Sequence, residues 1–382
     1  MGFHEFSSPY DWSRIAAYKR TAKAAFGGMI DLSVGSPVDP VPDSVRKALA
    51  VAANDPNAYG YPATAGTADL RAAIAEWFSA ARNVDLQAIH ADVVPTVGSK
   101  EGVALMASLL HFGEDDVVVQ PKVSYPTYEI GTQLAGAQVL KVDDVADVAS
   151  WRNVPGVKAV WVNSPCNPTG EVYSAERMAG IVAAAREIGA VVLSDECYAL
   201  MQWRGATNSA DDDPLQSTPC ALRSDVCAGS AEGVLVLYSL SKQSNMAGYR
   251  TAFIAGDESL IASMSAYRKQ IGQIIPGPVQ AAMAAGLRDL ESVKVQHARY
   301  RERLGMLVSA LRAYGYCTDM PDGALYVWVR AKSGDCWTDM EQLAKIGIIA
   351  SPGEFYGAPE CLRFSATASD EAIASAAERL AR

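Results

Sequence analysis

The sequence has little of what marks several protein classes: only four histidines, seven scattered cysteines, and no long apolar run. The cysteines form no Cys-x-x-Cys pair, which argues against a structural zinc site or a disulfide framework and fits a reducing compartment. The histidines do not stand at metal-ligand spacing from one another, so we expect no metal site. They are His4, His90, His111 and His297.

Membrane, secretory and nucleic-acid features are also lacking. The best apolar runs are broken by Gly, Pro or charge before they could span a bilayer. The N-terminus has no basic start followed by an apolar stretch, so we expect no signal peptide. Against 33 Lys and Arg stand 43 Asp and Glu, and this net charge of −10 argues against general nucleic-acid binding. We therefore expect a cytoplasmic protein with small-molecule partners.

The length of 382 residues predicts two lobes rather than one core. Short apolar runs alternate with helical stretches in the middle of the chain, which predicts a mostly parallel, doubly wound α/β sheet. The predicted strands are 116–120, 137–142, 157–163, 190–194, 233–239 and 251–255.

The C-terminal part has fewer strands between its helices. A long helical stretch is expected at about 278–314, followed by a strand at 325–329, a helix near 338–345, short strands near 348 and at 362–365, and a last helix. This pattern predicts a smaller α+β domain. We expect an N-terminal segment (1–45) that joins the small domain, a large domain (46–280) and the small domain itself (281–382).

Polar residues follow several predicted strands, and ligands of open parallel sheets bind at the carboxyl ends of the strands. Four runs stand in such positions: Gly98 to Lys100, NSPCNPTG (163–170), SDECY (194–198) and SLSKQSNMAGYR (239–250). The last run is the most specific piece of the sequence. Nucleotide-binding patterns of the Gly-x-x-x-x-Gly-Lys and Gly-x-Gly-x-x-Gly kinds are absent.

Taken together, these motifs resemble those of the class I/II aminotransferases, pyridoxal-phosphate enzymes of fold type I, over nearly the whole chain. The segments DLSVGSPVDPVP, YGYPATAGTADLR, SDECY and SLSKQSNMAGYR are similar to the actinobacterial succinyldiaminopimelate aminotransferases of lysine biosynthesis. The resemblance implies pyridoxal 5'-phosphate as cofactor and a large cofactor-binding domain beside a smaller one. It also implies a homodimer with shared active sites.

Under this resemblance Lys242 forms the Schiff base with the cofactor and then moves protons, tasks that need a primary amine. Asp195 would pair with the pyridinium nitrogen, although an Asp after a strand alone would more often cap the next turn. Tyr198 and Asn167 would donate to the 3'-oxygen of the ring. Tyr125 would stack on the ring.

The phosphate of the cofactor would be held by hydroxyl groups, a guanidinium and backbone amides. The residues implied are Ser99, Ser239, Ser241 and Arg250, with Tyr61 contributed by the neighbouring subunit. Lys100 matches the family position, either through its backbone amide or merely as a surface residue. Cys166 departs from the family pattern and is interpreted as a small buried residue.

Arg363 would bind the substrate α-carboxylate in a bidentate pair, joined by the backbone near Gly35 and the side chain of Asn167. The implied reaction moves an amino group between glutamate/2-oxoglutarate and N-succinyl-LL-2,6-diaminopimelate/N-succinyl-2-amino-6-oxopimelate. Distal carboxylates need further cations, and three candidates that could equally be solvated surface charges are Lys122, Arg268 and Lys269.

Other readings remain open at this point. The same fold also serves aminotransferases for aspartate, aromatic amino acids or acetylornithine, as well as lyases, decarboxylases and racemases. A pyridoxal-phosphate-sensing regulator would be a binding protein rather than an enzyme, but it would need an added DNA-binding domain.

Overall fold

The computed structural model describes residues 11–56, 58–203 and 218–382. Its centre is a seven-stranded sheet in the order β2-β8-β7-β6-β5-β3-β4. The strands are β2 (Ala91–Val97), β3 (Val117–Pro121), β4 (Gln138–Val142), β5 (Val157–Asn163), β6 (Val191–Asp195), β7 (Val234–Ser239) and β8 (Thr251–Asp257). β8 runs in the direction opposite to the other six strands, and the pairs that do not include β8 are parallel, which confirms the mostly parallel α/β sheet.

Six of these strands were predicted to within a few residues, and β2 was missed. Its sequence, ADVVPTV, contains Pro95, which cannot donate to a β-ladder and so argues against a strand. β2 lies at the edge of the sheet and pairs only with β8, a place where a proline is tolerated.

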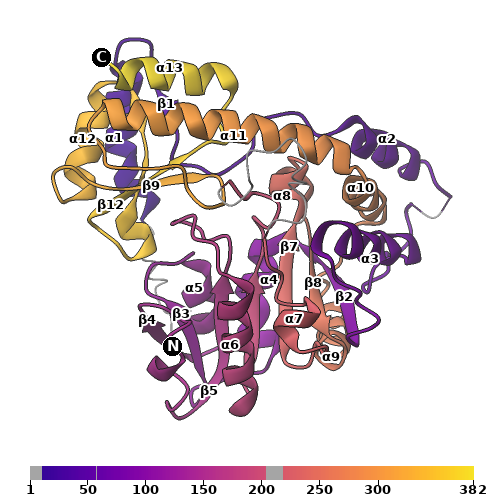
Figure 1. Cartoon of the computed structure of the whole chain (residues 1–382). Coiled ribbons are helices and arrows are strands. Elements are labelled where there is room, and N and C mark those ends of the chain that lie inside the picture. Colours follow the sequence, from indigo (N-terminus) through magenta and orange to yellow (C-terminus); the bar gives the residue numbers. More distant parts are fainter. Residues whose placement is uncertain (1–10, 57, 204–217) are drawn as a thin grey trace, which may run out of the picture.

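Helices cover both faces of the sheet, as the unbroken apolar strands require (Figure 1). In β7, for example, Val236 packs into the core on one face and Leu237 into the core on the other. The first face carries α3 (Ala68–Arg82), α6 (Ala175–Glu187) and α10 (Gly277–Arg288). The second carries α4 (Ser99–Leu109), α5 (Thr127–Leu134) and α9 (Glu258–Gln270).

A second lobe is built around an antiparallel sheet of β9 (Tyr326–Arg330), β12 (Cys361–Ser365) and β11 (Ser351–Pro352). Its core includes α12 (Cys336–Lys345) and α13 (Asp370–Leu380). The N-terminal part joins it through α1 (Ile15–Ala24) and through β1 (Ile30–Asp31), which pairs in parallel with β10 (Ile348–Ile349). The domain limits at 45/46 and 280/281 stay a prediction.

The long helical stretch predicted at about 278–314 is two helices, α10 and α11 (Leu290–Ala313). The chain breaks at Asp289, whose carboxylate accepts a hydrogen bond from the Ser292 backbone amide (3.0 Å) and so caps α11. α11, in orange, runs along the second lobe toward α10 (Figure 1).

The remaining elements of the described residues are one ten-residue helix, two single-turn helices and four 3₁₀ turns. They are α2 (Asp43–Ala52), α7 (Ser224–Cys227), α8 (Leu240–Gln243) and the 3₁₀ turns Trp12–Arg14, Val148–Ser150, Ala247–Tyr249 and Gly353–Tyr356.

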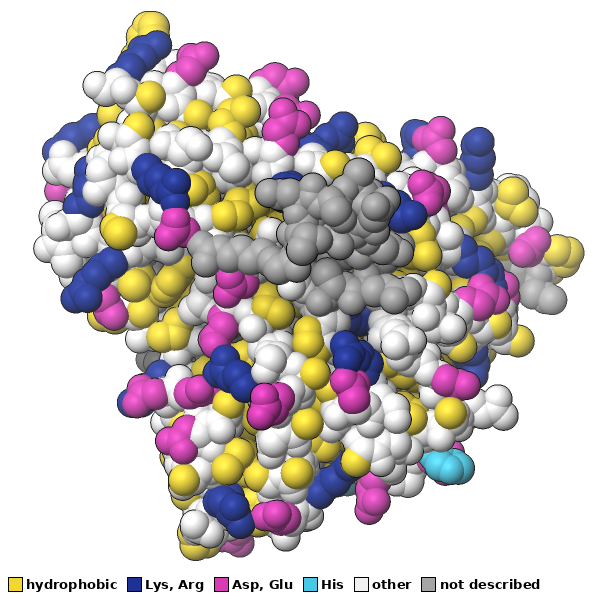
Figure 2. Space-filling view, in the orientation of Figure 1, with side chains coloured by type: hydrophobic (Ala, Val, Ile, Leu, Met, Phe, Trp, Pro, Cys, Tyr) yellow, Lys and Arg dark blue, Asp and Glu magenta, His cyan; other side chains and the backbone are white. Residues whose placement is uncertain are grey.

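The described helices include none that is both long and apolar enough to cross a membrane. Basic and acidic side chains are interspersed over the face drawn in Figure 2, without a large region of one sign. This distribution gives no support to a nucleic-acid surface on that face.

Candidate active site

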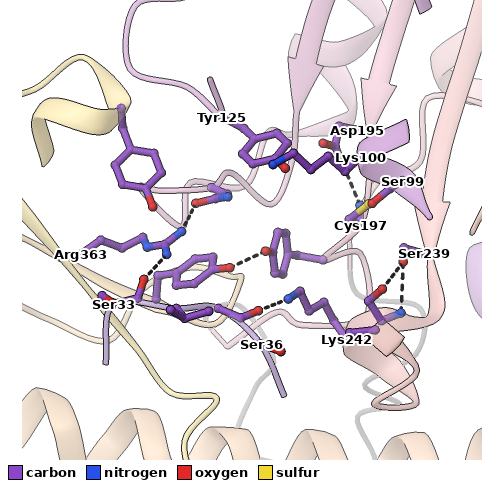
Figure 3. Close-up of a pocket in the computed structure, with 18 of the residues that line it drawn as sticks. Ser33, Ser36, Ser99, Lys100, Tyr125, Asp195, Cys197, Ser239, Lys242 and Arg363 are labelled. Atoms are coloured by element: carbon purple, nitrogen blue, oxygen red, sulfur yellow. Dashed lines mark hydrogen bonds between the residues drawn. The ribbon is translucent and has the colours of Figure 1, made fainter. Parts of the chain in front are cut away.

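The predicted site residues, with the exception of Tyr61, meet in one cavity of about 340 Å³ between the two lobes. The carboxyl ends of β5, β6 and β7 and the start of α4 form one wall, and the N-terminal segment and second lobe form the other (Figure 3). The lining residues are Trp12, Ser33, Val34, Gly35, Ser36, Ser99, Lys100, Tyr125, Asn167, Asp195, Cys197, Tyr198, Ser239, Ser241, Lys242, Ala247, Arg250, Tyr326, Tyr356 and Arg363.

Lys242 lies in α8, directly after β7 ends. Ser239 caps this short helix, because its hydroxyl accepts a hydrogen bond from the Ser241 amide (3.1 Å). The Lys242 amine donates to the backbone carbonyl of Gly35 in the opposite wall (Figure 3). Burial lowers the pKa of Lys242, which increases the fraction of neutral, nucleophilic amine at a given pH.

Asp195 is the last residue of β6 and is only 6% exposed. One carboxylate oxygen accepts from the Tyr128 hydroxyl (2.7 Å) and the other from the Cys197 amide (3.1 Å). Burial raises the pKa of Asp195, and no lysine or arginine of the described chain forms an ion pair with it. A buried carboxylate in this state calls for a cation from a ligand.

A cradle for an anion lies at the start of α4. Gly98 has a φ of +79°, and a Cβ placed there would lie 2.0 Å from the Arg250 guanidinium, so only glycine fits. Arg250 donates to the Ala247 carbonyl (2.8 Å) but forms no ion pair with a described residue. The hydroxyls of Ser99 and Ser241 line the same end of the cavity. These groups fit a phosphate.

Arg363 of β12 forms the opposite end of the cavity and is 4% exposed. Its guanidinium donates to Asn167 Oδ1 (2.7 Å) and to the Ser33 carbonyl (2.8 Å). The ring centroids of Tyr326 and Tyr356 lie 4.0 Å and 4.8 Å from its central carbon. These contacts hold the planar guanidinium in a fixed orientation, as bidentate binding of a carboxylate requires.

Two tyrosine hydroxyls join the lobes in the middle of the cavity. Tyr198, after β6, and Tyr326, in β9, have their hydroxyl oxygens 2.5 Å apart. Burial raises the pKa of Tyr198. A Cβ on Gly35 would lie 2.2 Å from the Tyr326 hydroxyl, so glycine leaves the space that this tyrosine occupies.

In the structure, every site residue predicted from the sequence except Tyr61 lies in the wall of this cavity. Tyr61 is fully exposed and does not line it. Tyr326 and Tyr356 were missed, as was Ser33. Tyr326 stands in an apolar run, and only the pairing of β9 with β12 brings it to the Arg363 side of the sheet.

The three cations suggested for distal carboxylates lie elsewhere. Lys122 is half-exposed and pairs with Asp143 (2.8 Å), and Lys269 is exposed on α9. The Arg268 side chain is fully buried against Glu101 (2.8 Å). Because none of them lines the cavity, none is in place to bind a substrate there.

The residues present fit pyridoxal phosphate. An uncompensated buried carboxylate suits a pyridinium, and a glycine cradle with an arginine and hydroxyls suits a phosphate. An amine of lowered pKa lies between them. No group of three or more His, Cys, Asp and Glu side chains suited to a metal ion is found in the described part of the chain.

Comparison with known proteins agrees with this geometry. The family described as Aminotransferase class I and II matches residues 27–380. The chain is 40% identical to the 4-dedimethylamino-4-oxo-anhydrotetracycline transaminase of Streptomyces rimosus, covering 97% of this chain and 98% of the relative. It is 29% identical to the LL-diaminopimelate aminotransferase of Syntrophobacter fumaroxidans, covering 97% and 95%.

Among solved structures, a probable N-succinyldiaminopimelate aminotransferase from Thermus thermophilus superposes with a TM-score of 0.81. That protein is 27% identical, and the match covers 97% of this chain and 99% of the other. The fold, the cavity and these relatives lead to one conclusion: the chain belongs to the class I and II aminotransferases and uses pyridoxal phosphate as its cofactor.

Proposed function

We propose that this aminotransferase converts glutamate and N-succinyl-2-amino-6-oxopimelate into 2-oxoglutarate and N-succinyl-LL-2,6-diaminopimelate. Support comes from the resemblance of several segments to succinyldiaminopimelate aminotransferases and from the similarity to the probable N-succinyldiaminopimelate aminotransferase of Thermus thermophilus. The observation that carries the proposal is Lys100, a cation in the cavity wall in addition to the three that the proposed mechanism uses.

Four cations line the cavity, and three have assigned tasks in the proposed mechanism. Lys242 reacts with the cofactor, Arg250 faces the phosphate cradle and Arg363 takes the carboxylate next to the reacting carbon. Lys100 is exposed and forms no ion pair with a described residue. It extends beside Tyr125 (Figure 3), where it can meet a carboxylate at the far end of a long substrate.

In the proposed mechanism, bound pyridoxal phosphate would supply an electron sink for the electrons of the substrate Cα–H bond. Arg363 would hold the α-carboxylate so that the Cα–H bond faces Lys242. The Lys242 amine would take the proton from Cα of the amino donor and, when the oxo acid is aminated, deliver a proton to Cα of the new amino acid. Asp195 provides the negative charge that keeps the ring nitrogen protonated. Tyr198 and Asn167 are assigned to the 3'-oxygen.

The decisive measurement compares kcat/KM for succinyldiaminopimelate, LL-diaminopimelate, acetylornithine, aspartate and an aromatic amino acid, with 2-oxoglutarate as acceptor. We expect succinyldiaminopimelate to be preferred. Lys100→Met should lower kcat/KM for it by roughly 10- to 100-fold, since a charged hydrogen bond contributes about 1.5–3 kcal/mol. The loss should be much smaller for an aromatic donor. A wild-type preference for aspartate or an aromatic amino acid would overturn the substrate proposal.

A second candidate function rests on the relative that is 40% identical to this chain. The Streptomyces rimosus relative is named for a 4-oxo-anhydrotetracycline. Such an acceptor lacks an amino-acid carboxylate for Arg363 to bind, so amination of it should tolerate Arg363→Lys better than amination of an oxo acid does. Turnover of a polycyclic ketone that is less sensitive to Arg363→Lys than turnover of an oxo acid would favour this second function.

We also propose a homodimer with shared active sites. Tyr61, assigned to the phosphate, is fully exposed and outside its own cavity, so in this arrangement a partner's cofactor is what it reaches. Mixed dimers of Tyr61→Phe and Lys242→Ala chains should regain one largely native site. A fully active monomer in sedimentation experiments would contradict the assignment.

A further inference from the structure

The segment that carries Tyr61 has little support of its own. Residues 58–66 connect α2 to α3 and are mostly exposed, with Tyr59 at 89% and Tyr61 fully exposed. We call residues 58–66 the arm. An exposed side chain can act on a partner only if the backbone beneath it is held in place, so the anchors of the arm decide where Tyr61 points.

The main anchor is Gln280 in α10, whose side chain is fully buried. Its carbonyl oxygen accepts from the Thr67 amide (2.8 Å), at the point where the arm enters α3. Its NH₂ group donates to the Ala63 carbonyl within the arm (3.0 Å) and to the Ile275 carbonyl (2.9 Å). One side-chain amide thus fixes the arm to the loop between α9 and α10.

The same loop is tied to the phosphate cradle of its own subunit. The buried guanidinium of Arg268 donates to the Gln273 carbonyl (3.2 Å) and to both oxygens of Glu101 (2.8 and 3.1 Å). Glu101 also accepts from the Val97 amide (3.1 Å), across the turn that contains Gly98. Buried, charge-assisted pairs of this kind fix a backbone turn strongly.

We propose that Gln280 is a positioning residue that acts on the partner's cofactor: it holds the arm, and with it Tyr61, in a fixed place relative to its own subunit's phosphate cradle. Glu101, Arg268 and the 271–276 loop complete the connection. The inference rests on the proposed shared-site dimer. It goes further by assigning the effect of a residue buried in one subunit to the site of the other.

Two mixed dimers with the same total substitutions provide the test. In the first, one chain carries Gln280→Leu and the other Lys242→Ala, so the only reactive lysine receives its arm from a chain with native Gln280. In the second, one chain carries both changes and the other is wild type, so the reactive lysine receives the altered arm. Two different affinity tags allow each mixed dimer to be purified.

The readout is cofactor bound to the reactive lysine, trapped by borohydride reduction and quantified by absorbance over a titration of pyridoxal phosphate. We expect native affinity in the first dimer and about tenfold weaker affinity in the second, because several hydrogen bonds to the arm are lost. Equal affinities in the two dimers, or weakening in the first alone, would overturn the inference. If Gln280→Leu does not give soluble dimers, Gln280→Asn replaces it in both pairings.

Two controls separate this inference from the function on which it rests. Gln296→Leu removes another buried side-chain amide, which bonds to Asp39 (2.9 Å) and Asn245 (3.2 Å) rather than to the arm, and it should leave both dimers alike. Tyr61→Phe is also combined with Lys242→Ala in the same two arrangements and measured in the same assay. If the dimer with both Tyr61→Phe and Lys242→Ala in one chain binds the cofactor as tightly as the dimer with the two changes in different chains, the shared-site dimer is wrong. If those two dimers differ and the two Gln280→Leu dimers do not, only the present inference fails.

Discussion

The two ends of the cavity are built in different ways. The phosphate end comes from one lobe and from two short segments, the Gly98 turn and residues 239–250. The carboxylate end is assembled from four distant parts of the chain, represented by Ser33, Asn167, Tyr326 and Arg363. A local motif can therefore encode the first end, whereas the second exists only once the lobes have packed together.

This difference implies a division of labour. Substitutions at the phosphate end should change cofactor retention for every reaction alike. Substitutions at the carboxylate end should change which substrates react and how fast, with little effect on the cofactor. Lys242 and Asp195 lie between the ends and should affect both.

The largest effect is expected for Lys242→Ala. The variant should lose turnover by roughly 10⁴-fold or more, since positioned proton transfer alone contributes about 10²–10⁴-fold and covalent attachment is lost as well. Turnover with 2-oxoglutarate and the amount of cofactor trapped by borohydride are the measurements. Lys269→Ala, an exposed lysine outside the cavity, is the control. Normal turnover without Lys242 would rule out its assignment.

Asp195→Asn should lower the rate of transamination by several orders of magnitude, because the ring nitrogen would lose its negatively charged partner.

Asp195 should also make the stability of the cofactor-free protein depend on pH. Burial raises the pKa of Asp195 above its unfolded value, so the native state favours the protonated acid. Its contribution to stability is therefore present at low pH and declines as pH rises through the native pKa.

Urea unfolding of cofactor-free wild type and Asp195→Asn checks this sign. The stability of the wild type relative to the variant should fall as the pH is raised from about 4 to 7. Parallel stability curves would show that the carboxylate is already compensated in the free protein.

The fold and the phosphate end could be predicted because they depend on local patterns. Short, continuously apolar runs between helical stretches made β5 to β8 predictable, and SLSKQSNMAGYR contains Lys242 and Arg250 in one segment. β2 was hidden by Pro95, and the break at Asp289 by a helical pattern on both sides. Tyr326 could not be assigned, because its role follows from strand pairing between residues far apart in the sequence.

Arg363→Lys and Arg250→Lys form a matched pair across the two ends. A lysine supplies a point charge but not the planar fork, so Arg363→Lys should lower kcat/KM for every amino acid by roughly 100-fold. The dissociation constant of the cofactor should change little. Arg250→Lys should mainly raise the dissociation constant of the cofactor and change kcat/KM of the cofactor-saturated enzyme little. If both variants lose cofactor equally, the proposed division between the ends is wrong.

The smallest effect, and the sharpest probe of the carboxylate end, is expected for Tyr326→Phe. The aromatic ring beside Arg363 remains, so KM for amino acids should stay near the wild-type value. The hydroxyl that bonds to Tyr198 is lost, and a net hydrogen bond of about 0.5–1.5 kcal/mol corresponds to a roughly 2- to 10-fold lower kcat.

Because burial raises the pKa of Tyr198, its hydroxyl stays protonated near neutral pH and can donate to the 3'-oxygen. If Tyr326 acts by orienting that hydroxyl, Tyr326→Phe should have almost no further effect once Tyr198→Phe is present. A double-mutant cycle on kcat measures this coupling, and additive losses would show that Tyr326 acts independently of Tyr198.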